Sequence, residues 1–210
     1  MSTLEVTLLP ICHKFNHQLT YLANNKIIWN NLRDGFPHPY ELKDAVKWVN
    51  TYLSEDEHKP FGRFIMVNSR PFLKTLTSEH VEAIKKDNGG EMPDTLLAGR
   101  IRGEVGYDVH RCTFEIGYIV GQPFWGKGIC TTALKQMVGV VYDSFPEVVR
   151  VYATPYKFNE ASRKVLIKAG FTYEGCLRSF AIKNGALVDC EMYSILKHEY
   201  FNTTAHLTGK

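Results

Sequence analysis

The residues with the clearest chemical purpose form a glycine-containing turn, residues 121–128, between a strand-like and a helix-like segment. Backbone N–H groups at the start of a helix have no acceptor within the helix, and the helix dipole adds about half a positive charge there. Glycines let a pyrophosphate approach these N–H groups, and Lys127 adds a full positive charge. The turn therefore predicts a site for a phosphorylated ligand.

Other interpretations of the same turn make different predictions. Residues 121–127 spell G-x-x-x-x-G-K, most of a Walker A loop, but Gly128 stands where Ser or Thr must reach magnesium. The later strand 151–153 leads into Thr154-Pro155 and not into a metal-binding aspartate, which disfavours nucleotide hydrolysis. A Rossmann fingerprint needs a glycine at Thr131 and an N-terminal βαβ unit, and neither is present. Taken alone, the turn is also compatible with a helix that merely begins with glycines.

Hydrophobic periodicity predicts the elements that must position this turn. Runs rich in branched and aromatic residues predict strands at residues 64–67, 96–101, 114–120, 148–153, 171–177 and 187–196. Helical spacing of apolar residues predicts helices at residues 41–53, 78–86, 129–141 and 160–168. Gly170 is the expected left-handed terminator of the last helix, and Asn184-Gly185 predicts a hairpin turn. This order of elements indicates an α/β or α+β sheet with at least one parallel crossover.

The composition is that of an ordinary globular protein. Its 210 residues are 44% apolar and 22% charged, which favours one domain, residues 1–210, with a surface insertion at residues 68–95. The tail after Phe201 is polar and is expected to fray. The net charge of +3 suits a phosphorylated cofactor but does not require nucleic acid or an acidic membrane as a partner.

The cysteine, apolar and histidine patterns argue against several other classes of protein. Five scattered cysteines without a C-x-x-C pair indicate reduced thiols in a cytoplasmic protein. No apolar run resembles a signal peptide or a membrane span. His13 and His17 lie four residues apart without an acidic or third ligand, so we expect no metal site.

Several ordered segments resemble the GNAT acetyltransferase superfamily, and within it the branch of RimJ/RimL-type ribosomal-protein N-acetyltransferases. The segments that carry this resemblance are EIGY at 115–118, FWGKGI at 124–129, NEAS at 159–162, KAGF at 168–171, EGCLR at 174–178, the strand 189–196, and FPHPY at 36–40 with Asp44, Ala45 and Trp48. Because they keep their order over most of the chain, these matches are more specific than the glycine turn alone.

The resemblance implies a mixed, strongly twisted central sheet, flanked by helices, whose two middle strands splay apart to admit the pantetheine arm of acetyl-CoA. It implies that the backbone of Tyr118, Ile119 and Val120 pairs with that arm, and that the Val120 N–H polarises the thioester carbonyl. Asn159 would hydrogen-bond the arm from the other side. The residues that would hold the pyrophosphate are Trp125, Gly126, Lys127, Gly128, Ile129, Cys130 and Thr131.

The sequence departs from the superfamily pattern at the group that protonates the departing thiolate. Many relatives place a tyrosine where Leu166 stands, so this role must pass to another residue. Ser162, one helical turn beyond Asn159, is our candidate, and a packing or capping hydroxyl is the alternative role for it.

The base that deprotonates the amine is also predicted from position. An amine has a pKa of about 10, so a carboxylate near the reacting atoms assists the loss of its proton. Glu115, at the mouth of the expected splay, is the first choice. Its rivals are Glu160, Asp189 and Glu191, and we expect Asp189 to fix the hairpin instead.

We expect a monomer or weak homodimer that transfers the acetyl group directly to an amine in a ternary complex. Phe36, Tyr40 and Phe180 form the expected acceptor side, where almost no acidic side chain is available to pair with a polyamine. This composition favours a protein or peptide N-terminus. A small-molecule amine acceptor, and a non-catalytic acyl-CoA-binding regulatory protein that lost the tyrosine, remain as alternatives.

Overall fold

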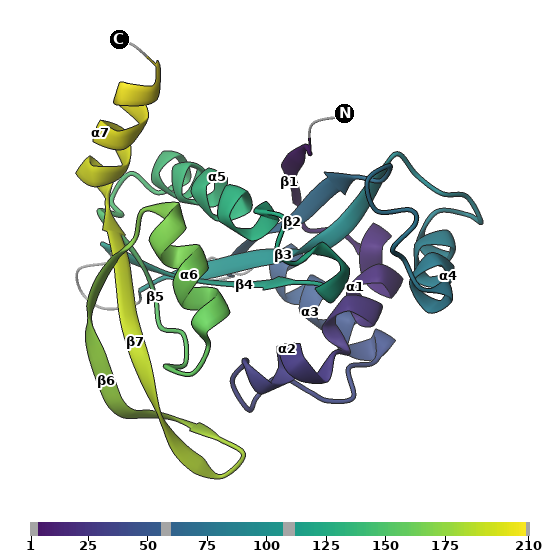
Figure 1. Ribbon diagram of the computed structural model, residues 1–210, viewed down its shortest axis with the longest axis horizontal. Coiled ribbons are helices and arrows are strands. Elements are labelled where there is room, and N and C mark those ends of the chain that lie inside the picture. Colours follow the sequence, from purple (N-terminus) through teal and green to yellow (C-terminus); the bar gives the residue numbers. More distant parts are fainter. Residues whose placement is uncertain (1–3, 56–59, 107–111, 209–210) are drawn as a thin grey trace. The chain divides into compact units, whose positions relative to one another are not determined.

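Seven strands form a mixed sheet in the order β1-β2-β3-β4-β5-β7-β6 (Figure 1). The computed structural model describes residues 4–55, 60–106 and 112–208. The chain divides into two compact units, the first made of Met1–Arg102 and Tyr118–Ala133, the second of Gly103–Gly117 and Leu134–Lys210. Strands β3 (Thr95–Val105) and β4 (Thr113–Val120) and helix α5 (Ile129–Ser144) contribute residues to both units. The predicted mixed α/β class, a sheet flanked by helices, is confirmed.

The first unit combines an antiparallel strand pair with helices from the N-terminal half. Its further elements are β1 (Val6–Pro10), η1 (His13–Phe15), α1 (Asn16–Ala23), α2 (Lys26–Asn30), α3 (Leu42–Leu53), β2 (Phe61–Asn68), α4 (Ser78–Asp87) and η2 (Gln122–Phe124). Helix α3 buries Ala45 and Val49 completely, whereas Leu42 and Leu53 at its two ends are exposed. At its start the Asp44 carboxylate accepts the Glu41 N–H at 2.9 Å, which satisfies a donor left over at the helix terminus. The N-terminal elements β1 and α1 were not predicted from periodicity.

The segment expected as a surface insertion, residues 68–95, contributes to the core of the first unit. Phe72, His80 and Ile84 are completely buried, and α4 packs against α1. The ring of Phe72 lies 4.9 Å from that of Phe124, just before the glycine turn. The segment is therefore not merely a surface excursion, although its status as an insertion relative to the family stays a prediction.

The second unit contains the predicted parallel crossover and the predicted hairpin. Its further elements are β5 (Arg150–Ala153), α6 (Glu160–Ala169), β6 (Thr172–Lys183), β7 (Ala186–Leu196) and α7 (Lys197–Thr208). Strands β4 and β5 pair in parallel, while β7 pairs antiparallel with both β5 and β6. Gly170 ends α6 with a left-handed φ of 97°, and Asn184 and Gly185 turn the hairpin with φ of 52° and 77°. Both turn predictions are therefore confirmed.

The polar tail after Phe201, which the sequence analysis expects to fray, begins within a helix. Helix α7 continues through this point to Thr208 and follows directly on the long β6–β7 hairpin (Figure 1). At its start the Glu199 carboxylate accepts the Leu196 N–H at 2.8 Å. The rings of Tyr200 and Phe201 lie 5.8 and 6.2 Å from the ring of Tyr142 on α5. These tertiary contacts hold a helix whose own polar sequence does not predict one. None of the described helices is both long and apolar enough to cross a bilayer.

Candidate functional site

The glycine turn leads from β4 through η2 into the start of α5, where Gly128 has no side chain that could cap the helix. Gly126 and Gly128 have φ of 73° and 78°, a left-handed conformation that residues with a Cβ adopt at a cost. Thr132 donates to the Gly128 carbonyl at 3.0 Å, which opens the helical hydrogen-bond series. The N–H groups of Ile129 to Thr131 precede this bond, and such groups have no acceptor within the helix. The turn therefore presents a set of backbone donors at the positive end of the α5 dipole.

The space beside this turn is open. A Cβ added at Gly126 or Gly128 would meet no heavy atom within 4 Å among the described residues. Lys127 between them is exposed, and its Nζ lies 5.8 Å from the centre of the Phe72 ring. Free backbone donors, a helix terminus and an unburied ammonium suit a diphosphate, so these residues fit the phosphate part of coenzyme A.

Trp125 fastens the loop that joins β4 to the turn. Its indole Nε1 donates to the Val120 carbonyl at 2.6 Å, and 40% of the residue remains exposed. Phe124 and Ile129 on either side of the turn are buried, at 1% exposure each. The turn is therefore anchored by two apolar side chains and one indole hydrogen bond, which keeps its donors in a fixed arrangement.

Strand alternation decides which backbone groups at the end of β4 point away from β3. Gly121 donates to the Ala98 carbonyl of β3 at 2.8 Å, and the Ile119 carbonyl lies 2.0 Å from where a Cβ of Gly99 would stand. Because successive residues alternate sides, the backbone groups of Tyr118 and Val120 point away from β3. By the same alternation the backbone groups of Ile119 are directed at β3, and its expected pairing with the cofactor stays a prediction.

Cys130 lies in the first turn of α5 and is half-buried. Burial raises the pKa of its thiol to about 12, because the thiolate loses its hydration. The side chain is therefore a neutral thiol at physiological pH and not a nucleophile. Thr131 beside it is also half-buried.

Helix α6 of the second unit begins with Asn159, whose side chain caps the helix. Its Oδ1 accepts the Ser162 N–H at 3.1 Å, while its Nδ2 has no hydrogen-bond partner among the described residues. Ser162 is half-buried in the first turn, and Leu166, one turn later, is completely buried. The Leu166 position therefore belongs to the core of this unit, and the role of Asn159 shown by its contacts is that of helix cap.

Glu115 occupies the last position at which β4 pairs with β5, opposite Tyr152. It is half-buried, and one carboxylate oxygen accepts the Thr154 hydroxyl at 3.0 Å. The predicted base is therefore held by a neutral hydroxyl, and none of the ion pairs found in the described residues involves it.

The rival carboxylates have structural partners. Asp189 accepts the Ser179 N–H at 3.0 Å and lies 3.4 Å from the Lys157 ammonium. The hydrogen bond from the Ser179 N–H is the main reason that the pKa of Asp189 is lowered. Glu191 is buried, 2.7 Å from Nε of Arg163 and 3.0 Å from the Tyr193 hydroxyl. Asp189 fixes the hairpin as expected, and the exposed Glu160 lies near Lys164 at 3.5 Å.

The expected acceptor residues are divided between the two units. In the first unit the rings of Phe36 and Tyr40 stack at 4.9 Å and 10°, and the Phe36 carbonyl accepts the Trp29 indole N–H at 2.9 Å. The Asn24 side chain accepts the Tyr40 N–H at 3.2 Å. In the second unit Phe180 lies on β6 with 54% of its surface exposed. The 36–40 loop is thus an ordered aromatic structure within its own unit.

Sequence reasoning missed Arg100 on β3. The residue is 4% exposed, and its guanidinium lies 3.9 Å from the Trp48 ring and 5.4 Å from the Phe36 ring. The available signal was a charged residue within an apolar strand pattern, residues 96–101. A cation at such a position is unusual because burial penalises its charge.

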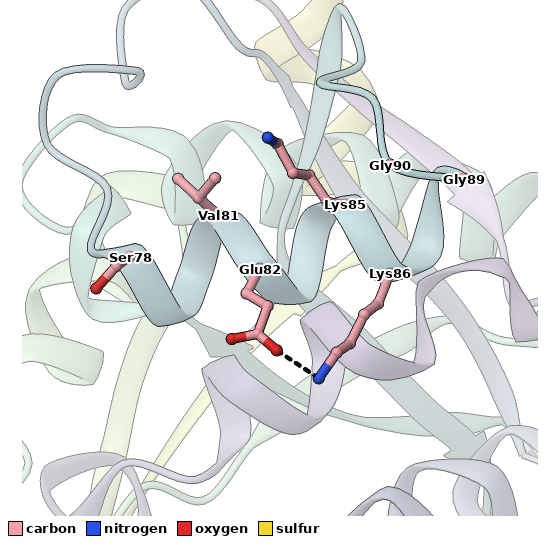
Figure 2. A pocket seen from close by; sticks show the side chains of 7 residues that line it. All are labelled: Ser78, Val81, Glu82, Lys85, Lys86, Gly89 and Gly90. Carbon is pink, nitrogen blue, oxygen red and sulfur yellow. Dashed lines mark ion pairs between the residues drawn. The ribbon is translucent and has the colours of Figure 1, made fainter.

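A hollow of about 480 Å³ lies on one face of α4 and the loop after it. Figure 2 shows its lining, in which Glu82 pairs with Lys86 at 2.7 Å and Lys85 points elsewhere. It contains neither aromatic side chains nor any residue of the glycine turn. We assign it no role. In the part of the chain that the structure describes, no three His, Cys, Asp or Glu side chains group as metal ligands.

In this mixed sheet β4 leads through a two-glycine turn to the start of a helix, an arrangement that suits proteins which bind acyl-coenzyme A. The family model described as Acetyltransferase (GNAT) domain matches residues 6–172, and the chain belongs to this family. The GNAT resemblance is therefore confirmed.

Individual relatives agree with this assignment. The putative ribosomal N-acetyltransferase YdaF of Bacillus subtilis is 37% identical over 168 residues, which cover 76% of this chain and 90% of that protein. This match agrees with the RimJ/RimL-like branch. The uncharacterized N-acetyltransferase p20 of Bacillus licheniformis is 36% identical over 86 residues, 41% of this chain. The chain spans about half the length of p20 and of one further Bacillus relative, 48% and 46%.

A crystal structure with the same fold contains ligands. The microcin C7 self-immunity acetyltransferase MccE, in complex with acetyl-CoA and AMP, is 25% identical with a TM-score of 0.68. The alignment covers 91% of this chain and 92% of that chain.

Proposed function

We propose that this protein is an acetyl-CoA-dependent N-acetyltransferase that acts on the amine of a protein or peptide N-terminus. The observation that carries the proposal is the turn at Gly126 to Thr131, with its left-handed glycines, outward backbone donors and exposed Lys127. Family membership and the acetyl-CoA in the MccE structure support the identity of the phosphorylated ligand.

When bound, acetyl-CoA supplies the acetyl thioester. In the first unit, the turn residues Trp125, Gly126, Lys127, Gly128, Ile129, Cys130 and Thr131 hold the pyrophosphate. The backbone of Tyr118 and Val120 pairs with the pantetheine arm, and the Val120 N–H donates to the carbonyl oxygen, where negative charge develops. The Trp125 indole N–H donates to the Val120 carbonyl and so holds the next peptide group, Val120–Gly121.

In the second unit we assign three roles. Asn159 offers Nδ2 to the pantetheine arm because its Oδ1 is occupied in capping α6. Glu115 accepts the proton that the amine loses, and Ser162 donates a proton to the departing thiolate. Cys130 remains protonated, so transfer occurs directly to the amine without an acyl-enzyme.

The acceptor is assigned from the chemistry of the aromatic loop. Phe36 and Tyr40 provide stacked rings, and the nearby buried charge is the cation Arg100. A polyamine would need several carboxylates, whereas an N-terminus brings one ammonium and neutral backbone. The name of the YdaF relative, a putative ribosomal N-acetyltransferase, supports a protein substrate. Small amines are the second candidate class.

Thermal melting tests the cofactor assignment. Acetyl-CoA at about 100 times its dissociation constant is expected to stabilise the protein by about 2.7 kcal/mol, and ATP with magnesium by far less. Gly128→Val is expected to abolish the acetyl-CoA shift, because its side chain would occupy the position of the pyrophosphate. Gly89→Val is the matched control, since Gly89 also has a positive φ of 62° and open space around it but lies outside the turn. Equal protection by ATP, or loss of the shift in both variants, would contradict the assignment.

An acceptor screen tests the second half of the proposal. Peptides with small uncharged first residues are expected to outcompete spermidine in single-turnover assays with acetyl-CoA. No thioester cleavage with peptides, polyamines, amino sugars or amino acids would instead indicate a non-catalytic acyl-CoA-binding protein.

A further inference from the structure

Arg100 is a buried cation without an anionic partner. It lies in β3 of the first unit at 4% exposure, and none of the ion pairs within the described residues involves it. Its Nη1 is buried and has no hydrogen-bond partner among the residues that the structure describes. Buried charges in proteins are normally paired because the loss of hydration is costly, so this arrangement requires an explanation.

The aromatic rings around Arg100 offset only part of the cost of burying its charge. The guanidinium lies 3.9 Å from the Trp48 ring and 5.4 Å from the Phe36 ring, both of which are half-buried. Ring faces attract a cation, but they do not accept the N–H groups that lie in the guanidinium plane. The rings therefore hold Arg100 in position and leave its Nη1 without an acceptor among the described residues.

Tyr40 adds a second unsatisfied donor. Its hydroxyl is buried without a partner in the part of the chain that the structure describes. Burial lowers the pKa of Arg100 to about 10, and Tyr40 raises that pKa in part. Burial raises the pKa of Tyr40, and Arg100 lowers it in part. Arg100 and the Tyr40 ring both lie against Phe36, at 5.4 and 4.9 Å from its ring, and Arg100 is still protonated at neutral pH.

We propose that Arg100, with Tyr40, binds a carboxylate of the acceptor, so that the substrate carries an anionic group close to its amine. The Arg100 Nη1 provides a charged donor for a carboxylate oxygen, and the Tyr40 hydroxyl adds a second donor. The inference rests on the proposed function and narrows its substrate class. The carboxylate comes either from an acidic side chain near a peptide N-terminus or from the α-carboxylate of an amino acid.

Matched acceptors measure the contribution of the carboxylate. Ser-Glu-Ala amide is compared with Ser-Gln-Ala amide, and serine with serinamide, as acceptors for acetyl-CoA. In at least one pair the carboxylate member is expected to have a kcat/KM about 10- to 100-fold higher, as hydrogen bonds to charged groups provide. A preference in the first pair alone identifies a peptide side chain, and in the second pair alone an amino acid.

Two substitutions assign that preference to Arg100. Arg100→Met is expected to reduce the ratio to about one and to leave the melting shift with acetyl-CoA unchanged. Arg102→Met is the matched control, because Arg102 lies two residues further along β3 but is exposed, and its variant is expected to keep the preference. Tyr40→Phe, which keeps the stacked ring, is expected to lower the ratio partially and covers the case in which Arg100→Met does not fold.

Melting shifts with the acetylated peptides, N-acetyl-Ser-Glu-Ala amide and N-acetyl-Ser-Gln-Ala amide, report binding without turnover. A carboxylate-dependent shift that Arg100→Met removes, in the absence of any transfer, would support the Arg100 site and reject the enzyme assignment. Equal use of carboxylate and carboxamide acceptors by an active protein would overturn the Arg100 site and leave the enzyme assignment intact. Weaker acetyl-CoA binding in Arg100→Met would also overturn it, since it would assign the guanidinium to a coenzyme phosphate.

Discussion

The proposed binding residues lie at the starts of two helices, α5 and α6, which differ in how their first backbone N–H groups are satisfied. Both leave backbone N–H groups without acceptors in the helix. Helix α6 satisfies one of them with its own Asn159 side chain and places Glu160 in its first turn. Helix α5 begins after Gly128, which has no side chain to offer, and has no acidic residue in its first turn. The start of α5, where no residue side chain at position 128 can cap the helix, is therefore the one that we propose binds an external anion.

Ser162 offers the largest expected effect and tests whether the start of α6 is only structural. If its hydroxyl protonates the thiolate, Ser162→Ala lowers kcat by about 100- to 10,000-fold with little change in the KM for acetyl-CoA. The Ser162 backbone N–H that Asn159 caps is retained in this variant, so the stability of α6 is expected to persist. Turnover equal to wild type would return Ser162 to a packing role.

His80, beneath the start of α5, provides a pH test. Burial lowers its pKa to about 4, and its ring packs 5.9 Å from that of Phe124. In the unfolded chain His80 takes up a proton near pH 6.5, whereas in the folded protein it does so only near pH 4. The stability that the neutral, buried ring provides is therefore fully present above pH 6.5 and is lost as the pH decreases towards 4. The free energy of unfolding is expected to fall by about 3 kcal/mol from this residue.

Urea unfolding of wild type and His80→Leu at pH 7 and pH 4.5 measures that contribution, since the other titratable groups are the same in both proteins. The variant is expected to lose less stability on acidification. An equal loss in the two proteins would show that His80 is not buried in its neutral form.

Gly128→Asp tests the uncapped start of α5 directly. A carboxylate at this position repels the pyrophosphate and competes for the same N–H groups, so acetyl-CoA is expected to bind about 100-fold more weakly. Titration calorimetry measures the affinity, and Gly89→Asp controls for the cost of a side chain at positive φ. If both variants bind acetyl-CoA as wild type does, the difference between the two helix starts has no functional meaning.

Asn159 produces the smallest effect and separates its two proposed roles. Asn159→Ala removes the cap of α6 and is expected to cost about 1 kcal/mol, a shift of about 2–4 °C in Tm. Asn159→Asp retains the capping oxygen but replaces the Nδ2 donor, so Tm is expected to recover while the KM for acetyl-CoA remains raised. A normal KM in both variants would limit Asn159 to capping.

Local patterns were sufficient wherever a residue type answers a local geometric need. Gly170 and Asn184-Gly185 adopt the positive φ values that their turns require, so sequence alone located the end of α6 and the hairpin. Gly126 and Gly128 do the same at the proposed phosphate site. The apolar stripe of α3 was likewise readable, because a helix buries one face at a fixed period.

Tertiary structure decided what depends on partners distant in sequence. The polar sequence of α7 did not predict a helix, because its Tyr200 and Phe201 are held by Tyr142. Periodicity also did not distinguish residues 68–95 from a surface excursion, since the burial of Phe72 and His80 depends on Phe124 and other residues far along the chain.

The sequence by itself determined the family, the sheet-and-helix class and the turn that presents backbone donors, because each follows from residue types at fixed spacing. Only the tertiary structure decided that Ile119 faces β3, that the Trp125 indole holds Val120, and that Arg100 is buried against Trp48 without an anion. The direction of a strand's backbone groups and the desolvation of a charge depend on neighbours that the fold brings together. The spacing of residues along the chain does not identify these neighbours.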